Sequence, residues 1–421
     1  MRSSFLCAAV AASCFIFSTR CAIAQSGDEP LSLQQAVTRT LERNLDLKAF
    51  EFELAAQSGR LQQARARPNP EVGVLVENAF GSGDRSSLDA AETTLSLGFL
   101  LEHGARQRRI DVAEASGGLL DTEGRIRRLD LAAETARRFV AVLSSQEVLA
   151  ASRRATQLAK ETADAVQARV RAAKAPQAEE ARAQAQLARV RLEEEHAEHQ
   201  LASARQRLAA LWGSTEPDFG AARGDLLAVP ALTAFDSLRT KLESNPDVAR
   251  LVSEKRLRET EQRLAEMRRR PPWQVTAGVR RFEAGEDHAF VVGLTVPIAS
   301  RDAVQGALVE ARAQAAQVDA RAAALRVQLD AELFGIYQEL RHAYAEVNTL
   351  RSEVLPRVEA AVEQSRYAYE RGRYGYIEWV AAQRELVELR RALLDASADV
   401  HRQRIEIERL TGTSLDGNFI P

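Results

Sequence analysis

The stretch Leu187–Leu211 reads LARVRLEEEHAEHQLASARQRLAAL, and 199 positions later Leu386–Leu410 reads LVELRRALLDASADVHRQRIEIERL. The two stretches match at positions that step alternately by three and four residues. The first set is Leu187, Val190, Glu194, Ala197, Leu201, Ala204, Leu208 and Leu211, and the second is Leu386, Leu389, Leu393, Ala396, Val400, Gln403, Ile407 and Leu410. This spacing is the heptad seam of a long helix, so the sequence predicts an internal duplication built on long helices.

The composition also favours long helices. Charged residues make up 28% of the chain and aromatic residues only 5%, a mixture typical of extended helices rather than of a compact mixed core. Lys and Arg number 57 against 59 Asp and Glu. This near balance of charge argues against nucleic acid as the main partner.

Residues 1–24 have the pattern of a secretory signal peptide. Arg2 precedes an apolar run over residues 5–17, and Ala22-Ile23-Ala24 forms an A-x-A cleavage site. The apolar run is too short to span a bilayer as a helix. We therefore expect an exported protein.

Lipidation at Cys14 or Cys21 is the alternative processing route. Arg20 directly before Cys21 disfavours it there, and the apolar run continues past Cys14. All three cysteines lie within the predicted signal peptide. The mature chain is therefore expected to have no disulfides and to depend on packing and assembly for its stability.

We expect two repeats after the signal peptide, each running from a helix through a β-hairpin to a long helical hairpin. The first repeat covers 25–213 and the second 232–412, with a linker at 214–231 and a tail at 413–421. The β-hairpins are predicted at 70–101 and 273–298, and the helical hairpins at 104–211 and 303–411. The opening helices are predicted over Leu31–Ala66, with Ser32 as N-cap, and over Leu232–Arg269, each stopped by prolines.

The predicted strands are about ten residues long, the length of a tilted transmembrane β-strand. In Gln274–Phe282, apolar Val275, Ala277 and Val279 alternate with Thr276, Gly278 and Arg280. Four strands cannot close a barrel, and an open sheet edge in lipid leaves backbone groups unpaired. Two copies would supply 8 strands and three copies 12. The strand count alone leaves both open.

Two very long helices are predicted, over Gly104–Ala172 and Ala303–Arg371. Each would extend for about 100 Å at 1.5 Å per residue, so it needs partner helices along its length. Pro356 is predicted to bend or unwind the second helix locally. The turns that end them are predicted at residues 173–176 and 372–375.

His196 and His199 are a candidate metal site on the returning helix of the first repeat. Their three-residue spacing puts both imidazoles on one face, where they could bind a divalent cation. The alternative is a solvated charged face, because four glutamates surround the pair. A metal site also needs further ligands and supporting hydrogen bonds, so the solvated face is the favoured interpretation.

The order helix, β-hairpin, helical hairpin, repeated twice after a signal peptide, resembles the TolC-like outer-membrane efflux proteins. Ala66-Arg67-Pro68-Asn69-Pro70-Glu71 is similar to the motif before the first strand in the CzcC-like components of heavy-metal RND efflux systems. Asn245-Pro246-Asp247 resembles the opening of the second repeat, and Thr295-Val296-Pro297-Ile298 the exit from the last strand. The segment from Arg371-Gly372 to Ala382-Gln383 resembles the turn at the periplasmic tip.

The resemblance implies a mainly α fold with a small β part, the TolC-like α/β barrel. It implies a homotrimer whose 12-stranded transmembrane β-barrel lies in the outer membrane of a Gram-negative bacterium, in contact with its lipid. Long helical hairpins would form a periplasmic α-barrel. The implied partners are a periplasmic membrane-fusion adaptor and an inner-membrane RND pump. The chain would then be a passive exit duct, with divalent heavy-metal cations as the expected substrate.

The resemblance also implies roles for residues at the two turns. Glu378, and Glu179 at the corresponding place 199 residues earlier, are candidates for the periplasmic aperture, the alternative being ordinary first-turn acids. Where a tip glycine is common, the first repeat has Ala173. Candidates for tip and adaptor contact are Ala175, Pro176, Gly372, Tyr374, Gly375, Tyr376 and Trp379. Tyr367 and Tyr369 join this cluster of aromatic residues, for which simple tip packing is the alternative.

Other functions remain open at the level of sequence. Within the channel class, the substrate could be a drug or a type I secreted protein. In another class, the chain could be a periplasmic coiled-coil adaptor or interaction protein, although two hairpins that each carry a β-pair favour the channel. No Gly-x-Ser-x-Gly, phosphate loop or His-Glu-x-x-His occurs, so we expect neither an enzyme nor a cofactor.

Overall fold

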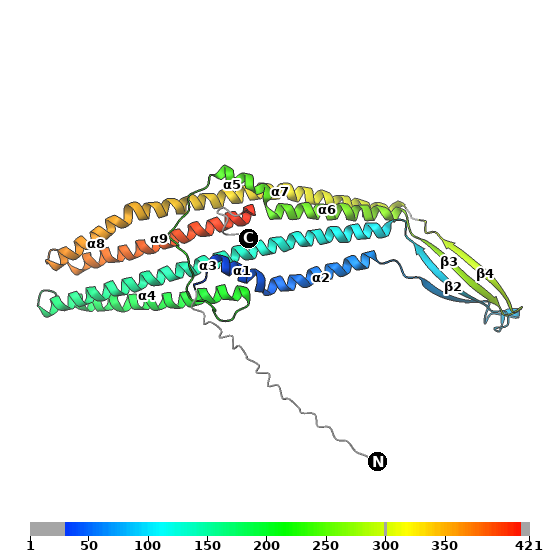
Figure 1. Cartoon of the computed structure of the whole chain (residues 1–421), viewed down its shortest axis with the longest axis horizontal. Coiled ribbons are helices and arrows are strands. Elements are labelled where there is room, and N and C mark those ends of the chain that lie inside the picture. Colours follow the sequence, from blue (N-terminus) through cyan, green and yellow to red (C-terminus); the bar gives the residue numbers. More distant parts are fainter. Residues whose placement is uncertain (1–29, 299–300, 414–421) are drawn as a thin grey trace, which may run out of the picture.

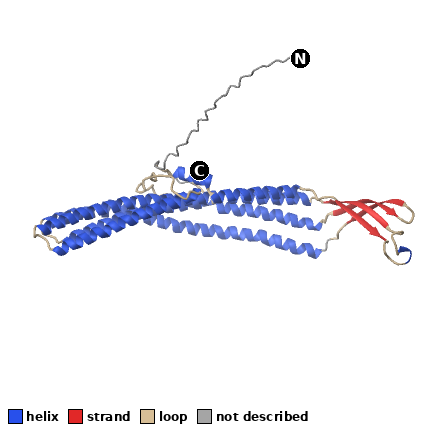
Figure 2. Cartoon of the chain, turned by 90° about the horizontal axis from the view of Figure 1, so that it is seen from below, coloured by secondary structure: helices blue, strands red, loops and turns tan. Residues whose placement is uncertain are grey.

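The computed structural model describes residues 30–298 and 301–413, and the predicted signal peptide and all of the tail beyond Thr413 lie outside them. The described chain is elongated, with a small sheet at one end and the turns of two helical hairpins at the other (Figure 1). A view turned by 90° has the same arrangement, with the strands confined to one end (Figure 2). None of the helices in the described ranges is long and apolar enough to cross a membrane.

The elements follow the predicted order in both halves of the chain. The first half contains α1 (Leu33–Arg43), α2 (Leu45–Arg65), β1 (Glu71–Glu77), β2 (Glu92–Leu101), α3 (Ala105–Arg171) and α4 (Gln177–Ala209). The second contains α5 (Phe235–Lys241), α6 (Pro246–Glu266), β3 (Trp273–Phe282), β4 (Asp287–Thr295), α7 (Arg301–Thr349), α8 (Leu355–Glu370) and α9 (Tyr376–Thr411). Helix α3 has 67 residues, which corresponds to about 100 Å.

The opening helix of each half is broken in two, where the sequence predicted one continuous helix. Ser32 is the N-cap of α1, as predicted, and forms a capping box with Gln35. The break comes at Asn44 and Asn245, whose ψ angles of 132° and 129° are not helical. Each asparagine accepts hydrogen bonds from the first turn of the following helix. The side chain therefore caps a new helix at the point where the backbone turns.

Pro356 disturbs the long second helix, as predicted. A π-helical segment, Leu350–Val354, separates α7 from α8, and Pro356 occupies the first turn of α8. Proline lacks the N–H that an α-helix would use there and crowds the preceding turn. The wider π turn accommodates this loss, so the chain remains helical through the proline.

The two halves share their hydrophobic core. Helix α3 packs against α4 of its own repeat and against α6 and α9 of the other. One cluster of buried side chains joins Val142 and Leu208 of the first repeat to Leu394 and Ile405 of α9. The repeats are thus one structural body rather than two independent domains.

Candidate functional site

The sheet at one end of the molecule has an exposed apolar face. Its strand order is β1-β2-β3-β4, and all neighbours are antiparallel, so directly paired residues lie on the same face. This face consists of Val72, Val74, Val76, Thr93, Leu95, Leu97, Phe99, Leu101, Trp273, Val275, Ala277, Val279, Arg281, His288, Phe290, Val292 and Leu294. Phe290 is 91% exposed and Val292 78%. A continuous exposed apolar surface of this kind marks contact with lipid or with another protein.

The opposite face, which we call the polar face, carries most of the polar residues of the strands and every strand glycine, namely Gly73, Gly98, Gly278 and Gly293. A Cβ on Gly278 would lie 2.5 Å from the Leu95 carbonyl oxygen, and one on Gly293 would lie 2.6 Å from Thr276 Oγ1. Such crowding on one face means that the sheet curves towards it. The polar face is therefore concave and the apolar face convex, as in one section of a barrel wall.

Arg280 organises the charges on the concave face. Its guanidinium donates to the Glu77 and Glu92 carboxylates at 2.8 Å each and to Thr94 Oγ1 at 2.9 Å. Asn78 Nδ2 also donates to Glu92, at 2.7 Å. These four contacts lie near the end of the sheet remote from the helices and hold both carboxylates in place on the polar face.

Strands β1 and β4 are the two edges of the sheet, and among the described residues each has one side without a strand neighbour. The helices that continue these edges also carry exposed apolar side chains. Helix α2 leads into β1 and exposes Phe52, while α7 follows β4 and exposes Val327 and Phe334. Open edges of this length need a partner strand.

At the other end of the molecule, the two hairpin turns have matching backbones. Ala173 (φ 53°) and Gly372 (φ 71°) both adopt the left-handed conformation, 199 residues apart. Glycine adopts this conformation without strain, whereas for alanine it costs about 1–2 kcal/mol of conformational free energy. The predicted tip residues Ala175, Pro176, Tyr374 and Gly375 complete the two turns, with Pro176 and Gly375 as N-caps of α4 and α9.

A compact aromatic cluster joins the two turns. Tyr369 of α8 stacks on Trp379 of α9 with ring centroids 5.0 Å apart, and both are buried. Arg169 of α3 lies over the Tyr369 ring at 4.8 Å and donates to the Glu370 carbonyl oxygen at 2.8 Å. Tyr376 is buried in the same cluster. The second repeat therefore supplies the aromatic rings and the first repeat the cation that covers them.

Glu179 is held in this cluster, whereas Glu378 is not. The Tyr369 phenol donates a hydrogen bond of 3.1 Å to the Glu179 carboxylate. Burial and the adjacent negative charge of Glu179 raise the pKa of Tyr369 to about 12, and burial also raises the pKa of Tyr376. Glu378 is exposed, and its carboxylate turns back towards Gly375, where a Cβ would lie 2.8 Å from it. The two predicted aperture residues thus occupy different environments.

A second link between the repeats lies deeper along the helices. Gln383 Nε2 of α9 donates to Thr162 Oγ1 of α3 at 3.0 Å, and both residues are buried. Arg384 donates to the Gln186 side-chain oxygen of α4 at 2.6 Å. Sequence reasoning missed Arg169, Thr162 and Arg280 as functional residues. The one available signal was an arginine at a position that alternates with the apolar residues of a predicted strand, and it applied only to Arg280.

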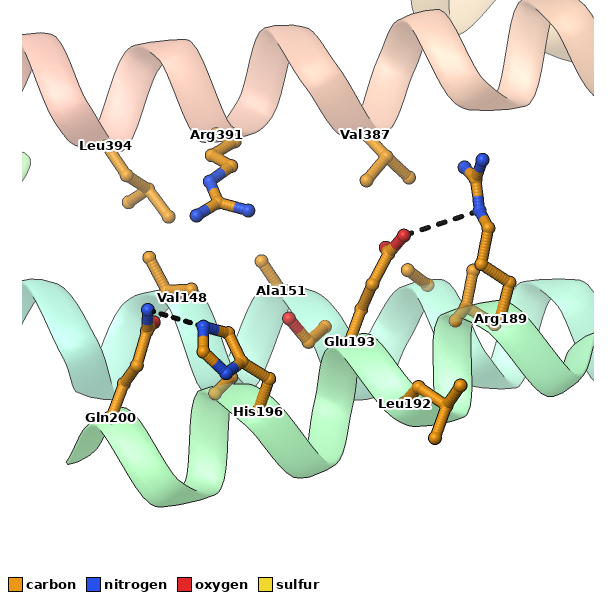
Figure 3. A pocket seen from close by; sticks show the side chains of 14 residues that line it. Val148, Ala151, Arg189, Leu192, Glu193, His196, Gln200, Val387, Arg391 and Leu394 are labelled. Carbon is orange, nitrogen blue, oxygen red and sulfur yellow. Dashed lines mark hydrogen bonds and ion pairs between the residues drawn. The ribbon is translucent and has the colours of Figure 1, made fainter. Parts of the chain in front are cut away.

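Both members of the predicted histidine pair are exposed on α4. His196 lines a groove between α3, α4 and α9 and interacts with Gln200 at 2.9 Å (Figure 3). Leu394 and Arg391 of α9 point into the same groove, but His199 is not among its lining residues. Within the described residues, no group of three or more His, Cys, Asp or Glu side chains is placed to hold a metal ion.

Comparisons with known proteins agree with this geometry. Residues 36–214 match the family model described as outer membrane efflux protein. The chain is 31% identical over 383 residues to the cobalt-zinc-cadmium resistance protein CzcC of Cupriavidus metallidurans, covering 91% of this chain and 90% of CzcC. It is 28% identical to the nickel-cobalt-cadmium resistance protein NccC of Alcaligenes xylosoxydans xylosoxydans, over 61% of this chain and 59% of NccC. The outer-membrane channel OprN has the same fold, with a TM-score of 0.73 at 18% identity over 91% of this chain and 90% of OprN.

The fold, the two-faced sheet and these relatives define the class of the protein as an outer-membrane efflux channel with a helical extension into the periplasm. The chain belongs to the outer membrane efflux protein family. The predicted TolC-like fold, mainly α with a small sheet, is confirmed, and the role of the family is transport.

Proposed function

We propose that the chain is the outer-membrane exit duct of a tripartite RND-type efflux system and that it exports divalent heavy-metal cations. The main observation in support of a duct is the curved sheet, which has a convex apolar face and a concave polar face and lies at the end of helices about 100 Å long. A surface of this kind suits a barrel wall with lipid outside and water inside. The duct does no catalysis of its own.

The open edges support assembly from several copies of the chain. The free side of β1 is complementary to the free side of β4 in a second copy, because both present unpaired backbone groups. In the same head-to-tail contact, exposed Phe52 of α2 meets the exposed apolar residues of α7. Such heterologous contacts close into a ring. With four strands per copy, we propose a homotrimer with a 12-stranded barrel.

The hairpin turns are proposed as the periplasmic gate and the contact surface for the adaptor. The support is the cluster that ties α8 to α4 and α3 through Tyr369, Glu179 and Arg169. Exposed Tyr374 and Ile377 border this cluster and are free to contact a partner. The adaptor would join the duct to an inner-membrane RND pump, which supplies the energy. Opening of the gate would separate the hairpins in a hinge or shear motion.

Metal cations are proposed as substrate because the relatives CzcC and NccC are resistance proteins for cobalt, zinc, nickel and cadmium, as their names state. A strain lacking the gene tests this directly. We expect sensitivity to at least one of these four metals and none to a panel of drugs, with resistance restored by the wild-type gene. Sensitivity to drugs alone would overturn the metal substrate.

Membrane fractionation tests the duct and its assembly. Heat-modifiable trimers in the outer membrane are expected, whereas soluble monomers would support a periplasmic adaptor instead. Gly278→Ala is the informative variant, because its Cβ would clash with the Leu95 carbonyl and flatten the sheet. Gly306→Ala on α7 is the matched control, since no atom lies within 4 Å of the added Cβ. Trimers should be lost in the first variant and kept in the second.

A further inference from the structure

Arginines concentrate where the chain passes between the helices and the sheet. Residues 65–71, 101–109 and 266–273 contain eight arginines, no lysine and only three acidic residues. We call these eight the arginine girdle: Arg65, Arg67, Arg106, Arg108, Arg109, Arg268, Arg269 and Arg270. The chain as a whole has a net charge of −2. The girdle is therefore a local excess of positive charge and not a reflection of the composition.

Three members of the girdle have carboxylate partners. Arg65 pairs with Glu114 at 3.3 Å and Arg108 with Asp111 at 3.2 Å. Arg109 donates to Glu102 at 2.9 Å, and this hydrogen bond holds the pKa of the Glu102 carboxyl below its usual value. The remaining five members make no ion pair or side-chain hydrogen bond with any residue that the structure describes: Arg67, Arg106, Arg268, Arg269 and Arg270.

The opposite rim of the sheet has the reverse charge. The loops and strand ends at 77–92 and 280–287 contain seven acidic residues and three arginines. Two of these arginines already have partners, since Arg280 binds Glu77 and Glu92, and Arg281 binds Glu283. The sheet thus separates a basic rim on the helical side from an acidic rim on the remote side.

An aromatic pair marks the level of the girdle on the apolar face. Trp273 is paired with Leu101 at the last register position of β2 and β3, so it ends the apolar face on the helical side. The His103 ring packs edge-on against it, with centroids 4.8 Å apart. Tryptophan at the border of an apolar band is typical of the membrane–water interface. The girdle therefore lies at the height of the lipid headgroups.

We propose that the arginine girdle binds the phosphates of anionic phospholipids in the membrane leaflet on the helical side of the sheet. This inference rests on the proposed function, because it needs the apolar face to lie in a bilayer. Guanidinium groups donate paired hydrogen bonds to phosphate oxygens and are weakly hydrated. Five such groups without an ion pair or side-chain hydrogen bond in the described chain, beside an apolar face, match a negatively charged headgroup with its acyl chains.

Quenching of Trp273 fluorescence by brominated lipids tests this inference. Trp212 and Trp379 are each 4% exposed and lie in the helical part, so Trp273 is the tryptophan that lipid can reach. The protein is reconstituted into vesicles of phosphatidylcholine and phosphatidylglycerol, with one or the other brominated. From the two quenching efficiencies, we expect the lipid around Trp273 to be enriched in phosphatidylglycerol about fivefold over phosphatidylcholine. This ratio corresponds to one well-placed arginine near a membrane surface.

The variant R268Q/R269Q/R270Q, which removes three of the five unpaired members, should clearly reduce this preference for phosphatidylglycerol. The matched control is R154Q/R191Q/R357Q, which removes the same charge from three exposed arginines on α3, α4 and α8 that have no ion pair within the described chain. The control should keep the wild-type preference. Excess inorganic phosphate should leave the preference unchanged, because the lipid and not free phosphate is the ligand.

The outcomes separate the two proposals. If Trp273 is quenched but R268Q/R269Q/R270Q keeps the full preference for phosphatidylglycerol, the proposal of a lipid site is wrong. The proposed function as a duct is not affected by that result. A preference abolished by inorganic phosphate would also overturn the lipid site. If neither lipid quenches Trp273 in folded trimers, the sheet does not lie in the bilayer, and the proposed duct fails together with the lipid site.

Discussion

Tyr369 donates a hydrogen bond of 3.1 Å to Glu179, although the two residues lie 190 positions apart and belong to different repeats. The bond connects α8 to α4 at the tip of the molecule, and the Arg169 guanidinium covers the same tyrosine ring from α3. Separation of the hairpins would have to break both contacts. If the hairpin turns form the gate, as proposed, this pair would act as a latch that favours the closed tip.

Tyr369→Phe is expected to weaken the latch and increase the open conductance. The phenyl ring can still stack on Trp379, but the hydrogen bond to a charged carboxylate is lost, which is worth about 1.5–3 kcal/mol. The equilibrium between open and closed tips should therefore shift by about tenfold or more. Single-channel conductance and open probability in planar bilayers measure this shift.

Tyr374→Phe is the matched control, because Tyr374 lies in the same turn, is exposed and has no side-chain hydrogen bond among the described residues. It should behave as the wild type. Glu179→Gln should resemble Tyr369→Phe, since it removes the charge of the acceptor. Equal conductance in all of these proteins would rule out a latch at Tyr369.

The same tyrosine should make stability depend on pH in the alkaline range. Its pKa is raised from 10 to about 12 in the folded protein. Below pH 10 the phenol is protonated in both states, and its contribution to stability is fully present. As the pH rises from 10 to about 12, the unfolded chain loses the proton and the folded protein does not, so stability falls.

Absorbance titration of the phenolate band should therefore contain a tyrosine that ionises near pH 12 and is missing from Tyr369→Phe. In that variant, the loss of stability between pH 10 and 12 should be smaller than in the wild type. A full complement of tyrosines ionising near pH 10 in the wild type would contradict the buried latch.

The repeated helices could be predicted from the sequence because their spacing is a local property. The seam residues Val190, Leu201 and Leu208 are buried on α4, and Leu393, Val400 and Ile407 are buried on α9. A heptad pattern specifies which face of a helix is covered wherever the partner lies. The same reasoning predicted the strands, whose alternation extends over the whole apolar face.

The contact between Tyr369 and Glu179 and the helix break at Asn44 could not be predicted in this way. Contact between Tyr369 and Glu179 depends on how the two repeats dock, and no spacing within either repeat encodes that arrangement. Pro246, in the first turn of α6, is a local signal for the break at Asn245, whereas no proline lies near the break at Asn44. Both breaks are stabilised by carbonyl groups about 165 residues away, so at Asn44 tertiary structure overrides the local preference.

Charge on the concave face of the sheet should control ion selectivity. Arg280→Gln leaves Glu77 and Glu92 without their cation on the polar face. The permeability ratio of cations to anions is expected to rise by up to about fivefold, since a unit charge contributes about 1 kcal/mol at close range in water. Reversal potentials across a salt gradient in planar bilayers give this ratio.

Arg281→Gln is a stringent control for that measurement. It removes the same charge from the adjacent residue, but Arg281 lies on the convex face and pairs with Glu283. Its selectivity should equal that of the wild type. A shift of the same size in both variants would mean that the concave face does not line the pore.

The two capping asparagines should each contribute strongly to stability. Asn44 Nδ2 donates to the Leu211 carbonyl oxygen at 2.8 Å, and Asn245 Nδ2 donates to that of Leu410 at 2.6 Å. Both acceptors end the returning helix of their own repeat, 199 residues apart. Replacement by alanine removes a helix cap, worth about 1 kcal/mol, and leaves a buried carbonyl unpaired, worth about 1–3 kcal/mol.

Asn44→Ala and Asn245→Ala are therefore each expected to lower the free energy of unfolding by about 2–4 kcal/mol, measured by denaturant unfolding of the folded protein. Asn245→Asp should lose at least as much, because it keeps the cap but places a carboxylate oxygen against the Leu410 carbonyl oxygen at a buried position. Asn348→Ala, at an exposed position within α7, should be neutral or slightly stabilising, since alanine has the higher helix propensity. Losses at Asn44 and Asn245 no larger than at Asn348 would mean that these caps do not hold the returning helices in place.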